Sequence, residues 1–155
     1  MAYSIKSLFK GAGGRLNRVV TREIFLYFLD LEVKRSRRYQ NFFCILILKL
    51  QELPEGIGEN RLHACYKRLI HLLTDEIRDS DILGILGEKK LGVILPYADM
   101  TAGGCTRSRF ASSLQYCDFT REGYQVLVEQ VCFPSDGTDT PALVRKVVGD
   151  ETSNS

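Results

Sequence analysis

The longest apolar stretch of the chain lies within Asn41–Leu50 (NFFCILILKL), and its uninterrupted part is Phe42–Leu48. It is far shorter than the ~20 residues that a transmembrane helix needs. It also lacks the polar–apolar alternation of a strand with one face in water. The stretch therefore predicts a strand that is buried on both faces, so helices must cover both sides of its sheet.

Helical patterns lie on either side of this strand. Thr21 to about Arg38 has helical spacing, with Thr21 as N-cap, Glu23 in the first turn and a basic end. Its apolar side is marked by Ile24, Phe25, Phe28, Leu29, Leu31 and Val33. A second helix is predicted from Arg61 to Ile77. Its two histidines fall on the polar face, so we expect surface residues there and not metal ligands: His63 and His71.

The second half of the chain begins with two apolar runs, Ile82–Leu86 and Leu91–Leu95, around a short polar piece. This pattern predicts a hairpin. Asp99 or Thr101 can cap a third helix through Leu114, and two further elements follow: a strand at Tyr124–Phe133 and a short helix at Thr140–Val148. One parallel crossover combined with an antiparallel hairpin predicts an α/β fold, a mixed central sheet with helices packed on its faces.

Composition narrows the function. A chain of 155 residues suits one domain, and its net charge of +2 is too small to indicate a nucleic-acid partner. We expect a cytoplasmic protein without metal or cofactor, because no secretory signal opens the chain and no Cys-x-x-Cys occurs. We expect the scattered cysteines to be buried free thiols in a reducing compartment: Cys44, Cys65, Cys105, Cys117 and Cys132.

The ends of the chain have a different character. Residues 1–13 are expected to be a tail or linker, ending in Gly11-Ala12-Gly13-Gly14, and residues 149–155 a disordered polar tail. The domain then spans 14–148. Basic residues alternate with apolar ones near the N-terminus, which we interpret as a solvated lead-in in preference to a membrane-surface segment: Lys6, Lys10, Arg15 and Arg18. This segment is a candidate connection to a sensor domain or protein partner.

A family resemblance rests on the order and spacing of several short motifs. Arg78-Asp79-Ser80-Asp81 is followed by 82–86 and then by Gly87-Glu88-Lys89-Lys90-Leu91. The chain resembles a GGDEF domain, the diguanylate cyclase family, in degenerate form and over nearly its whole length. Three further matches support this: Thr21–Phe25 at the family's first-helix signature, Glu32 with Arg35, and the Leu95-Pro96 ending. The resemblance implies a nucleotidyl-cyclase-like mixed sheet.

The departures from the family concern catalysis. Active members join two GTP molecules with two divalent metals, held by an acidic residue at the end of the first strand and by the third residue of the hairpin motif. Lys49 and Lys89 stand at these positions, and an ammonium has no lone pair for a metal. Glu88 replaces a glycine and Lys90 a glutamate. We therefore expect no catalytic residues, no metal and no diguanylate cyclase activity. For the lysines we favour a solvated turn over a phosphate site, since the adjacent Glu88 argues against an anion.

The family's product-inhibition site is retained in sequence. The resemblance implies that Arg78, Asp81 and Arg109 bind cyclic di-GMP, because an arginine fork can bind guanine through two acceptors. The alternative is structural: Asp81 caps the strand entrance, Arg78 ends a helix, and Arg107 and Arg109 form a solvated face.

The sequence thus predicts an inactive receptor for cyclic di-GMP that relays to a protein partner, with ligand-driven homodimerisation as a hypothesis. Two alternatives stay open. One is an interaction module that binds no nucleotide. The other, which we favour least, is a GTP-binding regulatory domain or residual enzyme.

Overall fold

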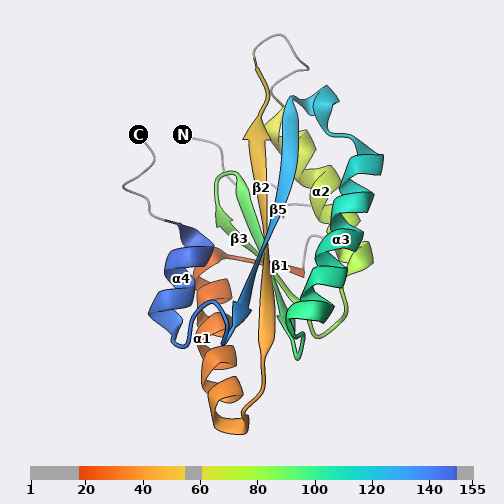
Figure 1. The fold of residues 1–155 in the computed structure, drawn as a ribbon. Coiled ribbons are helices and arrows are strands. Elements are labelled where there is room, and N and C mark those ends of the chain that lie inside the picture. The colour runs from red at the N-terminus through yellow and green to blue at the C-terminus, as the bar shows by residue number, and fades with distance from the viewer. Residues whose placement is uncertain (1–17, 55–60, 150–155) are drawn as a thin grey trace.

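The computed structural model describes residues 18–54 and 61–149. The expected tail 1–13, the glycine linker, residues 55–60 and the end of the polar tail lie outside these ranges. Five strands form one sheet, with helices on both sides (Figure 1). In chain order the elements are β1 (Val19–Val20), α1 (Arg22–Tyr39), β2 (Phe43–Glu52), α2 (Leu62–Glu76), β3 (Ile82–Gly87), β4 (Lys90–Pro96), α3 (Met100–Cys117), the 3-10 turn η3 (Thr120–Glu122), β5 (Tyr124–Phe133) and α4 (Thr140–Val148).

The sheet is mixed, as predicted, and its strand order is β1-β3-β4-β2-β5. Only β1 and β3 pair in parallel, whereas β3–β4, β4–β2 and β2–β5 are antiparallel. The crossover from β2 through α2 therefore leads to a strand of the same direction, β3, but β4 lies between the two. None of the described helices is long and apolar enough to cross a bilayer.

Strand β2 separates two apolar cores. Alternate residues Cys44, Leu46 and Leu48 face the core under α2 and α3. Their neighbours face the core under α1 and α4: Phe43, Ile45 and Ile47. These six side chains are fully buried, which confirms the prediction of a strand covered on both faces. Figure 1 shows the same division, with α1 and α4 on one side of the sheet and α2 and α3 on the other.

Helix α1 begins as predicted, since Thr21 Oγ1 accepts a hydrogen bond from the backbone N–H of Ile24. Its buried stripe is narrower than predicted and consists of Phe25, Leu29 and Val33, together with Ser36. The other apolar residues on the predicted side face solvent, with exposed fractions of 46% for Ile24, 37% for Phe28 and 42% for Leu31. The prediction was wrong for them because the helix meets the sheet along a single narrow line.

Helix α3 packs closely on β2 through a glycine. A Cβ at Gly103 would lie 2.6 Å from Cys44 Sγ, so a larger residue here would push the helix away from the sheet. Asp99, not Thr101, is the N-cap and accepts from the N–H of Ala102. Cys44, Cys65 and Cys132 are buried free thiols, and both histidines are exposed, as predicted. The prediction of burial was wrong for Cys105, which is exposed on α3, and for Cys117, which is half-buried at the end of that helix.

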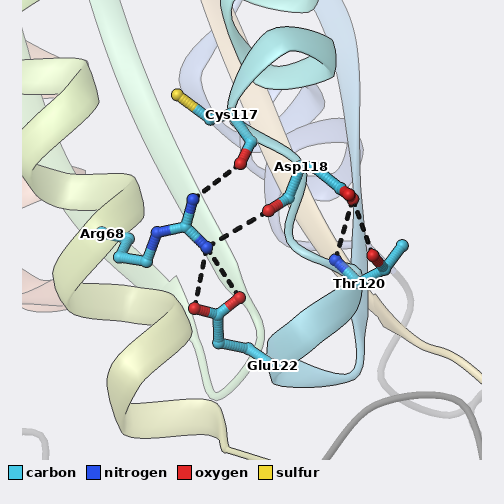
Figure 2. Close-up of polar contacts among 5 residues, drawn as sticks. All are labelled: Arg68, Cys117, Asp118, Thr120 and Glu122. Atoms are coloured by element: carbon cyan, nitrogen blue, oxygen red, sulfur yellow. Dashed lines mark hydrogen bonds and ion pairs between the residues drawn. The ribbon is translucent and has the colours of Figure 1, made fainter.

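A polar lock joins α2 to the end of α3 (Figure 2). Arg68 Nη1 contacts both carboxylate oxygens of the buried Glu122 at 2.7 Å, and Arg68 Nη2 donates to the Cys117 carbonyl at 2.6 Å. Asp118 then accepts from the N–H and the hydroxyl of Thr120. Since these residues lead directly into β5, the lock fixes where that strand begins.

Candidate functional site at the hairpin base

The two ends of the β3–β4 hairpin carry most of the predicted site residues. We call Arg18, Glu76, Arg78, Asp81 and Arg109 the hairpin base, and Gly87–Lys90 the hairpin tip. Arg78 and Asp81 lie in the turn between α2 and β3, while Arg109 comes from α3. The base and the tip are described in turn because their cations have different partners.

Asp81 organises the hairpin base. Its side chain is 2% exposed, and Oδ2 accepts the backbone N–H of Arg78 at 2.8 Å. The Arg78 guanidinium is 70% exposed, with its Nε 4.0 Å from the same oxygen. Asp81 thus closes the turn before β3, which is the structural role that the sequence left open. The second oxygen, Oδ1, is buried and has no hydrogen-bond partner among the described residues.

Two further arginines reach the same turn. Arg18 Nη2 donates to the carbonyls of Arg78 and Asp81, both at 3.0 Å. Arg18 is therefore part of the folded domain, and its interpretation as part of a solvated lead-in was wrong. Arg109 binds Glu76 instead, with Nε 3.0 Å from Oε2 and Nη2 3.2 Å from the Glu76 carbonyl. Ser113 donates to the other Glu76 oxygen at 2.7 Å.

The electrostatics of the base centre on Asp81. Burial raises the pKa of its carboxyl, and the hydrogen bond from Arg78 N–H, together with the charges of Arg78, Arg18 and Arg109, acts in the opposite direction. All three guanidinium groups are therefore near enough to influence one carboxylate. Of the predicted residues, Arg78 and Asp81 contact each other within one turn, whereas Arg109 contacts Glu76 at the end of α2, and both arginines are exposed to solvent.

The lysines of the hairpin tip bind groups of the protein itself. Lys90 Nζ donates to the Val148 carbonyl at 2.8 Å, at the end of α4, where a positive charge stabilises a helix. Lys89 Nζ lies 3.2 Å from Glu52 Oε2. The expected solvated turn was thus wrong for Lys90, which is half-buried and caps α4. Tyr66, buried in α2, donates from its hydroxyl to the Glu88 carbonyl and fixes the turn.

The two positions that the family resemblance matches to metal ligands, Lys49 and Lys89, both form ion pairs in the structure. Lys49 pairs with Lys90 in the β2–β4 register and forms an ion pair with Glu129 at 2.9 Å. Each matched position, Lys49 and Lys89, thus presents an ammonium where Mg²⁺ would need an oxygen. Over residues 18–54 and 61–149, no group of three or more Cys, His, Asp or Glu side chains is arranged to hold a metal ion.

Sequence reasoning missed Arg18, Glu76 and Tyr66. Arg18 bonds to carbonyls 60 and 63 positions away, and no local pattern reports such a contact. Glu76 looks like an ordinary polar residue of a helix end, and Tyr66 like one more member of an apolar stripe. For Tyr66 alone a signal existed, since a buried tyrosine hydroxyl usually finds a partner.

Comparison with known proteins identifies the fold. No protein-family model and no curated protein sequence matches the chain. Solved structures do match. A DGC protein from Thermotoga maritima superposes with a TM-score of 0.70 at 15% identity, covering 88% of this chain and 100% of that one. A microbial GGDEF domain studied with bis-(3′,5′)-cyclic di-GMP gives 0.63 at 13%, covering 83% and 80%.

A third match is the diguanylate cyclase SiaD of Pseudomonas aeruginosa, solved in complex with its activator SiaC. It gives a TM-score of 0.59 at 18% identity and covers 72% of this chain and 45% of that one. The chain therefore has the GGDEF, nucleotidyl-cyclase-like fold that the sequence predicted. At these identities the likeness concerns the fold alone.

Proposed function

We propose that this chain is a catalytically inactive GGDEF-type signalling domain that binds cyclic di-GMP at the hairpin base and relays the signal to a protein partner. The observation that carries the proposal is the arginine cluster at the turn before β3, where Arg78 lies beside the buried Asp81, Arg18 bonds to the carbonyls of the turn, and Arg109 contacts Glu76 at the end of α2. Support for the ligand class comes from the fold, because a structural neighbour was studied with this dinucleotide.

The chemistry of the base suits a dianionic guanine dinucleotide. The exposed Arg78 guanidinium can fork onto a phosphate or onto the two adjacent acceptors of guanine. Asp81 Oδ1 has no donor among the described residues, so it can accept from a guanine N–H once the turn opens slightly. Arg109 would supply the second cation after it leaves Glu76 and binds the ligand instead.

Loss of catalysis is the second part of the proposal. Phosphoryl transfer by this fold needs metals to neutralise developing charge on the phosphate. Lys49 and Lys89 hold ammonium groups at the matching positions, and their charges are neutralised by Glu129 and Glu52. An assay with GTP and Mg²⁺ should therefore yield no cyclic di-GMP above the rate of a heat-denatured sample. Detectable turnover would overturn this part.

The binding proposal is tested by calorimetric titration of cyclic di-GMP into the wild-type protein and Arg78→Ala. Micromolar binding that disappears in the variant supports it. Arg107→Ala is the matched control, since this exposed α3 arginine contacts β5 and not the hairpin base. If neither the wild-type protein nor the control gives heat while the fold is intact by circular dichroism, the site is not a receptor.

An interaction module without nucleotide is the alternative function. It is favoured by the occupation of the base in the structure, where Arg109 is held by Glu76 and Asp81 by its own turn. In that case the melting temperature will not change with any guanine nucleotide. A GTP-binding domain is favoured by one observation only, a cavity of about 320 Å³ at the hairpin tip lined by Arg22, Lys89 and Lys90.

Ligand-driven dimerisation is a further hypothesis. A dinucleotide has two equivalent halves, and the exposed Arg78 and Arg109 of one copy would bind one half. Sedimentation with saturating cyclic di-GMP should then show a doubled mass that Arg78→Ala lacks. An unchanged mass at saturation contradicts the dimer and leaves the receptor proposal standing. The structure of SiaD with SiaC supports a protein partner for this fold in general.

A further inference from the structure

Over residues 18–54 and 61–149, strand β5 pairs with β2 alone and is therefore an edge of the sheet. The hydrogen bond from Leu53 N–H to the Gly123 carbonyl, at 2.9 Å, shows which facing residues of β2 and β5 are hydrogen-bonded pairs. In an antiparallel pair, hydrogen-bonded and non-hydrogen-bonded residues alternate. Leu53 and Gly123 extend the register of Glu52 with Tyr124, so the odd-numbered residues of β5 bond to β2. The even-numbered residues point their N–H and C=O groups outward.

Both ends of this outward edge are closed by the protein. Tyr124 N–H donates to the Phe119 carbonyl at 3.2 Å, and Cys132 N–H donates to Asp136 Oδ2 at 2.7 Å. Between them lie Val126, Val128 and Gln130. Among the described residues one contact reaches the backbone of this stretch from the outer side, from Arg107 Nε to the Val128 carbonyl at 3.3 Å. Within the part of the chain that the structure describes, the middle of the edge is thus open, whereas both of its ends are hydrogen-bonded.

A groove runs beside the open stretch. It lies between β5 and the second half of α3 and has a volume of about 570 Å³. Its apolar lining includes Ala111, Leu114, Phe119, Val126 and Val128. Arg107 and Asp118 also line it, and Thr120 donates to Asp118, which holds the pKa of that carboxyl below its usual range. An edge with unpaired backbone groups beside an apolar groove is the arrangement to which an extended peptide adds as another strand.

We propose that β5 and α3 form a docking site for an extended segment of a protein partner, which adds to the sheet beside Val126–Gln130. The segment carries apolar side chains at alternate positions, for the groove, and a carboxylate next to Arg107. When the segment binds, one of its backbone N–H groups replaces Arg107 as the donor to the Val128 carbonyl. The released Arg107 guanidinium then forms an ion pair with the carboxylate of the segment. The site is independent of cyclic di-GMP, because Arg109 faces Glu76 on the α2 side.

A second copy of this chain fits the edge less well than an acidic segment. Pairing of two β5 edges about a two-fold axis at Val128 brings the two copies of Arg107 to the same place. Their like charges would then oppose each other. An acidic partner segment removes that repulsion and replaces it with an ion pair.

The test is a selection from displayed peptides of about nine residues, long enough at ~3.3 Å per residue to cover the open edge. Every second position is apolar, and the others are drawn equally from Asp, Glu, Lys, Arg, Ser and Thr. Selected peptides should be enriched in acidic residues, and amide hydrogen exchange should show new protection at Val126, Val128 and Gln130. Val128→Pro removes an outward N–H without deleting a bond to β2, so it should weaken binding at least about tenfold.

Lys67→Glu, a charge reversal on the exposed face of α2 and outside the groove, is the matched control for Arg107→Glu and should bind like the wild-type protein. Arg107→Glu should reject the acidic peptides while melting as the wild-type protein does, so the test stands even if Val128→Pro is poorly folded. Failure to enrich any peptide, enrichment of basic peptides, or equal binding by Arg107→Glu would overturn the proposal. Concentration-dependent dimerisation that protects the same amides without peptide would overturn it too.

Discussion

The two ends of the β3–β4 hairpin carry similar charge and differ in what that charge contacts. At the tip, Lys89 and Lys90 bind a carboxylate and the last carbonyls of α4. At the base, Arg78 and Arg18 contact the turn that holds the buried Asp81, which keeps one oxygen without a donor among the described residues, and Arg109 binds the neighbouring Glu76. Net charge would rank the two ends equally, because the base has three arginines against Glu76 and Asp81, and the tip has two lysines against Glu88. The contacts make the tip a structural element and the base the better candidate for an anionic ligand.

The largest effect is expected from the base. Arg78→Ala combined with Arg109→Ala should lower the affinity for cyclic di-GMP at least roughly 100-fold, since hydrogen bonds to charged groups contribute about 1.5–3 kcal/mol each. Lys89→Ala should leave it unchanged. Calorimetric titration of both variants tests whether the ligand binds at the base. If the lysine variant loses affinity and the double variant does not, the ligand binds at the tip and this assignment is wrong.

The next effect is on stability and comes from the tip. Lys90→Glu places a carboxylate against the Val147 and Val148 carbonyls at the end of α4. It should lower the free energy of unfolding by about 2 kcal/mol, the upper range for a charge at a helix end. Lys89→Glu should lower the free energy of unfolding much less, because this side chain is 37% exposed and its ion pair with Glu52 lies in water. Urea unfolding measures both, and equal losses would contradict the assigned role of Lys90.

The pH dependence of the free energy of unfolding should distinguish the buried Asp81 from the exposed carboxylates. Because burial raises the pKa of this carboxyl, the native protein holds a proton where the unfolded chain has already lost it. The free energy of unfolding should therefore fall as the pH rises from the ordinary aspartate value through the raised one. Asp81→Asn keeps an acceptor for Arg78 N–H and should flatten that part of the profile. An unchanged slope in this variant would mean that another group titrates.

The smallest effect concerns Glu76. Glu76→Gln weakens the hold on Arg109, whose side chain is 55% exposed. Exposed ion pairs contribute about 0.2–1 kcal/mol, so the affinity for cyclic di-GMP should rise by up to about fivefold. Ser113→Ala, which removes a neighbouring contact without touching Arg109, is the control. A decrease in affinity for Glu76→Gln would show that Glu76 supports the site and does not compete with the ligand.

Much of the fold followed from local patterns. The cap at Thr21, the hairpin turn and the bounds of β5 and α4 were predicted because each depends on residues close in sequence. The strand order was not, since nothing local says that β4 lies between β2 and β3. The two-residue strand β1 was missed because it is too short to show any periodicity.

The candidate site divides in the same way. The spacing of Arg78, Asp81 and Arg109 came from the family resemblance, and in the structure Arg78 contacts Asp81 while Arg109 contacts Glu76. The residues that contact this site, Arg18 and Glu76, could not be identified from the sequence, because their contacts depend on the packing of distant elements. The role of Lys90 was hidden for the same reason, since it depends on where α4 ends.

The measurement that tests the central claim most directly is amide hydrogen exchange of the wild-type protein with and without cyclic di-GMP. The account predicts new protection at Arg78–Asp81 and in α3 around Arg109, with no change at Gly87–Lys90. Protection confined to the hairpin tip would contradict it, because the ligand would then bind where the lysines are already engaged.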